Sequence, residues 1–158
     1  MMDVPAIKPY TPGQEGAIHH LIKEVYDEFV SGDCTEEGNR LFYDWIAPER
    51  IAERQRNEIN LRVATDRDAI VGMIEIRNRN IITLLFVDKA YQRRGIGKML
   101  FREMLAECMH RDPAMTTFYV HASLFSVPVY EKLGFVASGN VTGEFGIRYL
   151  PMEMKVGA

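Results

Sequence analysis

Gly95 and Gly97 stand where an apolar stretch, Ile81–Val87, leads into a long amphipathic segment, and three cations accompany them: Arg93, Arg94 and Lys98. A change from strand to helix at this point would present backbone N–H groups without intrahelical partners, together with the positive end of the helix dipole. Because glycine has no Cβ, an anionic group could approach those N–H groups closely. The run therefore predicts a phosphate-binding turn. The alternative is a glycine-bearing loop flanked by ordinary surface cations.

The spacing within this turn excludes the two commonest nucleotide motifs. A dinucleotide fingerprint needs a third glycine near Leu100, and a nucleoside-triphosphate loop needs a Gly-Lys-Ser/Thr run, whereas Met99 follows Lys98. The run instead resembles the Gln/Arg-x-x-Gly-x-Gly/Ala signature of the GNAT-type N-acetyltransferases. This resemblance implies that the loop holds the pyrophosphate of acetyl-CoA through Gln92, Arg93, Arg94, Gly95, Ile96, Gly97 and Lys98.

A second motif begins at Tyr130 and continues as Glu131-Lys132-Leu133-Gly134-Phe135. From local physics alone, Tyr130 is a core aromatic on a helix whose hydroxyl bonds to the backbone. Tyr-x-Lys-x-Gly-Phe also resembles the second signature of the same family, which implies that Tyr130 lies near the coenzyme sulfur and protonates the leaving thiolate. Ser123 stands upstream, where the family often has asparagine. Serine still offers a donor and an acceptor, so a coenzyme contact is expected there too.

Acetyl transfer to an amine requires a neutral nitrogen. An alkyl amine with a pKa of about 10.4 costs about 4.6 kcal/mol to deprotonate at pH 7, so a general base or a water chain must take the proton. The resemblance implies that the coenzyme lies along Leu85, Phe86 and Val87, where a backbone N–H binds the carbonyl. Some relatives carry a glutamate base near the start of this strand, but Ile81 holds the matching place here.

Two other side chains are candidates for the base. Glu75 is expected opposite Thr83 on one face of the sheet if residues 78–80 close a hairpin. The alternative is a solvated strand glutamate. His121 ends the strand before the second motif, and histidine as a residue type titrates near neutral pH. The alternative is a histidine bonded to the adjacent loop. A water relay through backbone carbonyls needs neither residue.

The elements that would position these groups follow from hydrophobic periodicity and turn residues. Strands are expected at 7–10, 61–65, 69–77, 81–87, 117–121, 135–138 and 148–156, and helices at 11–30, 35–46, 48–57, 95–110 and 126–133. The consecutive strands between 61 and 87 are expected to be antiparallel. The order β-α-α-β-β-β-α-β-α-β-β predicts a mixed α/β (α+β) fold with a largely antiparallel central sheet flanked by helices. This order also resembles the GNAT fold over most of the chain.

The composition is typical of a soluble, cytoplasmic globular protein. The chain has 158 residues, of which 47% are hydrophobic and 26% charged, and is expected to form one domain, 1–158. A net charge of −3 argues against a nucleic-acid partner. No membrane span or signal peptide is expected. Two cysteines form neither a disulfide framework nor a metal-ligand cluster, so no metal is expected.

The expected acceptor region, by family analogy, is the first two helices, which are acidic and contain Tyr26, Phe42, Tyr43 and Trp45. An acidic, aromatic-lined rim would attract a cationic amine; the alternative is the polar face of two helices. The overall hypothesis is an N-acetyltransferase that transfers the acetyl group of acetyl-CoA directly to a primary amine of a small molecule or peptide. A homodimer is compatible with it. The alternative is a non-catalytic acyl-CoA-binding or regulatory module on the same fold, and a third hypothesis is an ATP- or NAD-binding domain.

Overall fold

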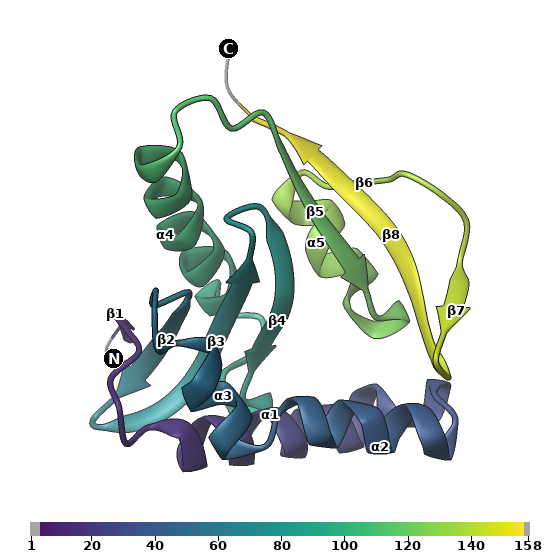
Figure 1. Cartoon of the computed structure of the whole chain (residues 1–158), viewed down its shortest axis with the longest axis horizontal. Coiled ribbons are helices and arrows are strands. Elements are labelled where there is room, and N and C mark those ends of the chain that lie inside the picture. Colours follow the sequence, from purple (N-terminus) through teal and green to yellow (C-terminus); the bar gives the residue numbers. More distant parts are fainter. Residues whose placement is uncertain (1–3, 157–158) are drawn as a thin grey trace.

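The computed structural model describes residues 4–156, which form one mixed sheet with helices on both faces (Figure 1). The strands are β1 (Ala6–Pro9), β2 (Leu61–Asp66), β3 (Ala69–Arg77), β4 (Ile81–Val87), β5 (Thr117–Ala122), β6 (Val136–Ala137), β7 (Thr142–Glu144) and β8 (Ile147–Lys155). The helices are α1 (Glu15–Phe29), α2 (Glu36–Trp45), α3 (Pro48–Arg54), α4 (Ile96–Arg111) and α5 (Val127–Leu133). The sheet order is β1-β2-β3-β4-β5-β8-β6, and β7 pairs with β8. All pairs are antiparallel except β4 with β5, so the predicted fold class is confirmed.

Two hydrophobic cores lie on opposite faces of the sheet because successive strand side chains point to opposite sides. Ile74 and Ile76 of β3 belong to one core, which they share with Leu100 of α4. Met73, which precedes Ile74 and points to the opposite side, belongs to the second core with Ile22 of α1. The helices α4 and α5 therefore cover one face, and α1, α2 and α3 cover the other, mainly over β2, β3 and β4.

The sheet opens between β4 and β5. These strands pair only at Ile81 with Tyr119 and at Ile82 with Val120, and they diverge beyond those residues (Figure 1). The register of β3 against β4 shifts at the same level: Glu75 pairs with Leu84, and Ile76 pairs with Ile82. Thr83 is therefore the extra residue of a β-bulge. After Thr83, the backbone of β4 borders the opening between β4 and β5 in the middle of the sheet.

The order of helices and strands predicted from the sequence lacks two short elements of the structure, strand β7 and helix α3. The glycine-containing connection before the last strand contains β7, because Phe145 and Gly146 adopt φ values of 54° and 83° and close a hairpin from β7 into β8. The short helix expected at 48–57 is present as α3, although the predicted order of elements omitted it. Within the described residues, no helix is both long and apolar enough to cross a bilayer.

Candidate active site

The turn between β4 and α4 has the geometry of an anion-binding site. Gly95 precedes the helix with φ 82°, a left-handed conformation that favours glycine, and Arg93 also has a positive φ, of 65°. The first intrahelical hydrogen bond runs from Met99 N–H to Gly95 O at 3.0 Å. The N–H groups of residues 96–98 therefore begin the helix without intrahelical acceptors. A Cβ on Gly97 would meet only Val87 Cγ2, at 3.8 Å, so the backbone here is open to a ligand.

Side chains on either side of the turn tie it to the sheet. Gln92 Nε2 donates to the carbonyl oxygen of Val87 at 3.0 Å, and the Tyr91 hydroxyl donates to Asp66 Oδ2 at 2.6 Å. The Arg94 guanidinium lies 5.3 Å from the centre of the Tyr91 ring. Arg93, Arg94 and Lys98 are exposed around the turn. Gln92 therefore anchors the turn to the end of β4, while the cations surround its N–H groups.

The strand segment that leads into the turn is half-buried on both faces. Leu85 and Val87 pack toward the α4 core, whereas Phe86 packs toward the α1 core, where its ring centre lies 6.1 Å from that of Phe42. Their backbone lies beyond the last paired residue of β4 and β5. An extended ligand could therefore hydrogen-bond there without displacing a strand.

Tyr130 is a core residue of α5. It is 4% exposed, and its ring packs edge-to-face against Phe135 with the ring centres 5.5 Å apart. Its hydroxyl has no hydrogen-bond partner among the described residues, so the expectation of a bond to the backbone is wrong. Burial raises the pKa of this hydroxyl above its usual value, which keeps the proton on the oxygen.

Ser123 directly precedes the short 3-10 turn Leu124–Ser126 that connects β5 to α5. Its hydroxyl lies 2.8 Å from the Ser126 hydroxyl, which also donates to the Ser123 carbonyl oxygen at 2.9 Å. The serine at this position therefore shapes the entry to α5. If the Ser123 hydroxyl also contacts the coenzyme, it does so while it is hydrogen-bonded to the Ser126 hydroxyl.

Glu75 is a buried, ion-paired carboxylate rather than a solvated one, so that alternative is wrong. It is 2% exposed, and Arg54 Nε lies 3.1 and 3.2 Å from its two oxygens. Gln55 Nε2 donates to Oε2 at 2.6 Å, and Thr83 Oγ1 lies 3.4 Å from Oε1. Burial raises the pKa of the carboxyl, and the neighbouring Arg54 opposes this shift. The expected proximity to Thr83 is found, but it depends on the bulge, since Glu75 pairs with Leu84.

Beside Glu75 lies a cavity of about 630 Å³ between α3, the β3–β4 turn and the Thr83 bulge, and Trp45 and Arg54 also line it. The interactions that define this site join residues far apart in the sequence. Sequence reasoning missed Arg54 and Gln55, because neither carries a motif and each meets Glu75 only through the packing of α3 on the sheet.

His121 lies on β5, on the sheet face opposite Val120 and Ala122, which are buried in the α4 core. It is exposed, and its ring stacks on Tyr149 with centres 4.0 Å apart and an interplanar angle of 9°. No hydrogen bond to the adjacent loop is present in the described part of the chain. His121 and Glu75 share a sheet face, but β4 lies between their strands.

Two of the aromatic residues expected at an acceptor rim are core residues. Tyr26 and Phe42 are buried, with ring centres 3.8 Å apart, and Tyr26 donates to Asn39 Oδ1 at 2.7 Å. They face inward because they share the apolar sides of α1 and α2. Tyr43 bonds to Asp27, and Trp45 stacks on Arg54 with the guanidinium carbon 4.1 Å from the ring centre.

Several solved acetyltransferases have the same arrangement of helices and strands. A GCN5-related N-acetyltransferase from Rhodopseudomonas palustris superposes with a TM-score of 0.82 at 21% identity, covering 99% of this chain and 98% of that one. The PaiA N-acetyltransferase from Thermoplasma acidophilum, solved with coenzyme A, superposes with a TM-score of 0.76 at 16% identity, covering 98% and 100%. The chain therefore shares the fold of these two proteins.

The family follows from sequence matching. A family model described as acetyltransferase (GNAT) domain matches residues 30–156, and the chain belongs to this family. The uncharacterized N-acetyltransferase YitH from Bacillus subtilis (strain 168) is 33% identical over 126 residues, which are 78% of this chain and 43% of that protein. The chain thus spans less than half the length of this curated relative. The predicted family is confirmed.

Proposed function

We propose that the protein is an acetyl-CoA-dependent N-acetyltransferase that transfers the acetyl group directly to a primary amine of a small molecule or peptide. Membership of the GNAT family supports acetyl transfer. Two structures with this fold, PaiA and an aminoglycoside 6'-N-acetyltransferase, were solved with coenzyme A, which supports the cosubstrate. The observation that carries the proposal is the glycine turn, whose free N–H groups and cations suit a pyrophosphate.

In this proposal the coenzyme lies along the opening between β4 and β5. The N–H groups of residues 95–98 bind its pyrophosphate, with Arg93, Arg94 and Lys98 around it. Its pantetheine arm follows Leu85, Phe86 and Val87, and a backbone N–H of this segment stabilises the oxyanion of the tetrahedral intermediate. The sulfur then lies near Tyr130. The chain's contribution is to place the thioester and the amine together and to exclude water.

Glu75 is the preferred general base. Its buried carboxylate contacts the bulge residue of β4, next to the proposed path of the thioester, and burial raises its pKa above the usual value of a glutamate. Glu75 first takes one proton from the ammonium, directly or through a water, and the neutral nitrogen then attacks the carbonyl carbon. When the C–S bond breaks, the thiolate takes the proton of the Tyr130 hydroxyl, and the second proton of the nitrogen returns to the Tyr130 oxygen through water. His121 is the alternative base, on the same sheet face but exposed, and a water relay is the third.

The other properties proposed for the protein follow from the same hypothesis. We propose a single acetyltransferase domain, 1–158, that works in the cytoplasm without a metal ion, a membrane or a nucleic acid. No group of three or more potential metal-ligating side chains lies together within the described residues. A homodimer is compatible with this function.

Thiol release from acetyl-CoA across a panel of amines tests the proposal. We expect at least one amine to produce thiol and its N-acetyl product at matching rates. The alternative function, a non-catalytic acyl-CoA-binding module, draws support from Ile81, which stands where some relatives carry a glutamate base. Tight coenzyme binding without turnover of any amine would favour that module.

A further inference from the structure

The cavity beside Glu75 contains a cationic group whose hydrogen bonds are incomplete. Arg54 holds the Glu75 carboxylate through Nε, donates from Nη1 to the carbonyl oxygen of Trp45 at 2.8 Å, and stacks on the Trp45 ring. Its Nη2 is buried and has no hydrogen-bond partner among the described residues. The ion pair with Glu75, the hydrogen bond to the Trp45 carbonyl oxygen and the contact with the Trp45 ring together fix the orientation of the guanidinium.

A buried guanidinium nitrogen without an acceptor is costly, because its N–H groups have given up water and gained nothing in return. Such a group is explained when a ligand supplies the acceptor. A guanidinium matches the planar oxygens of a carboxylate better than any other common anion-binding side chain. The missing partner of Nη2 is therefore expected to be an anionic oxygen.

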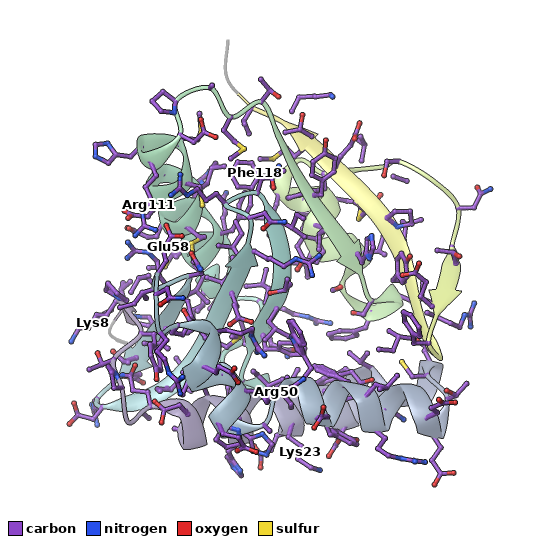
Figure 2. The ribbon with its side chains drawn as sticks, viewed as in Figure 1. Lys8, Lys23, Arg50, Glu58, Arg111 and Phe118 are labelled. Atoms are coloured by element: carbon purple, nitrogen blue, oxygen red, sulfur yellow. The ribbon has the colours of Figure 1, made fainter. Side chains whose placement is uncertain are left out.

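The charges around the cavity also favour an anion. The two acidic side chains in its wall are already paired: Glu75 with Arg54, and Glu58 with Arg79 at 3.4 Å. Glu58 also pairs with Arg111, at 2.5 Å (Figure 2). Arg77, which also lines the cavity, is exposed and forms no ion pair within the described residues. Three arginines and two glutamates line the cavity, so its wall carries a net positive charge.

We propose that this cavity binds an acceptor that carries a carboxylate next to its amine, as α-amino acids do, with Arg54 Nη2 as the anchor for the carboxylate. The inference rests on the proposed N-acetyltransferase function and names the acceptor class of that site. The adjacent opposite charges of Glu75 and Arg54 match the two charges of such an acceptor: the ammonium faces Glu75, and the carboxylate faces Arg54. Arg77 extends the positive wall toward the entrance.

Matched acceptor series test the proposal: the common L-amino acids, their carboxamides, and the corresponding amines without the carboxylate. Thiol release and calorimetric binding to the coenzyme A-bound protein are measured for each series. We expect the best amino acid to exceed its amide and its amine by about tenfold or more in kcat/KM, as the loss of a hydrogen bond to a charged group implies. Amides or plain amines that react equally well or better would overturn the carboxylate assignment and leave the acetyltransferase proposal intact.

Two further outcomes separate the proposals. If coenzyme A binds but no amino acid binds or reacts, the carboxylate assignment is wrong. If coenzyme A does not bind, the proposed function itself fails.

Two variants on one helix provide the matched comparison. Arg54→Lys keeps a positive charge beside Glu75 but removes Nη2, whereas Arg50→Lys changes an exposed arginine of α3 that pairs with Asp44 at 3.5 Å. We expect Arg54→Lys to raise KM for amino acids about tenfold or more and to leave KM for the amides within about twofold. Arg50→Lys should leave both unchanged. An equal loss for amino acids and amides in Arg54→Lys would show that Arg54 acts only by holding Glu75.

Discussion

Gly38 and Gly146 lie in backbone contact: a Cβ on Gly38 would be 2.4 Å from the carbonyl oxygen of Gly146. The same oxygen accepts a hydrogen bond from Thr35 N–H at 2.8 Å, and the Thr35 hydroxyl accepts one from Gly38 N–H at 3.0 Å. This contact joins the β7–β8 hairpin to the beginning of α2 (Figure 1). It therefore connects the helices on one side of the opened sheet with the strands on the other.

Gly38→Ala is expected to destabilise the protein, because the new methyl group meets backbone rather than a flexible side chain. Overpacking of this kind typically costs about 1–3 kcal/mol in the free energy of unfolding. Denaturant unfolding measures the loss. Gly16→Ala, in the first turn of α1 with no atom within 4 Å of the added Cβ, is the control. It should be neutral or stabilising by at most about 1 kcal/mol. Equal stability of the Gly38 variant and the parent would contradict the close contact.

Gly97→Asp is expected to weaken coenzyme binding without harming the fold, and Gly97→Ala, which the Gln/Arg-x-x-Gly-x-Gly/Ala signature accepts, is the matched control. An added Cβ makes only an ordinary contact with Val87, but the carboxylate of an aspartate would stand among the N–H groups proposed to bind the pyrophosphate. We expect the Kd for coenzyme A to rise about tenfold or more in Gly97→Asp, because like charges repel, with no loss of Tm. Calorimetry and thermal unfolding provide the two readouts. An unchanged Kd would place the pyrophosphate elsewhere.

Tyr130→Phe tests the proposed acid. The ring and its edge-to-face contact with Phe135 are kept, so the variant should fold normally. Loss of the hydroxyl should lower kcat about 100-fold or more while KM for acetyl-CoA changes little, because acid–base catalysis typically contributes that much. Steady-state kinetics gives both values. A kcat within about twofold of the parent rules out proton donation by this hydroxyl.

The pH dependence of kcat/KM tests Glu75 as the base. A protonated carboxyl cannot accept the amine proton, so activity is lost as the pH falls through its pKa. Because burial raises that pKa above the usual 4.5, the acid limb should lie at a pH higher than an ordinary glutamate would give.

Glu75→Gln should abolish this limb and reduce kcat/KM about 100-fold or more. If instead His121→Gln abolishes the limb and Glu75→Gln does not, His121 is the base.

Local sequence patterns were sufficient to predict most of the fold. Alternating apolar residues gave β2, β3 and β4, and the glycine turn predicted the start of α4 to within one residue, at Ile96. The β7–β8 hairpin was missed because Phe145 adopts a positive φ, which residue type alone does not indicate. These differences arise where backbone conformation depends on tertiary contacts.

The candidate site was less predictable than the fold. The residues of the proposed phosphate-binding loop are consecutive in the sequence, at 92–98, so they could be found from their spacing alone. The surroundings of Glu75 could not be found in this way, because its partners are Arg54, the last residue of α3, and Gln55, which follows it. Its contact with Thr83 also requires a bulge. A pattern of alternation predicts which face a glutamate occupies, but not whether an arginine from a distant helix covers it.

Calorimetric titration of the protein with acetyl-CoA, and separately with ATP and with NAD, tests the central claim most directly. We expect saturable, one-site binding of acetyl-CoA that Gly97→Asp weakens, and no comparable binding of the two nucleotides. Binding of ATP or NAD without binding of acetyl-CoA would contradict it.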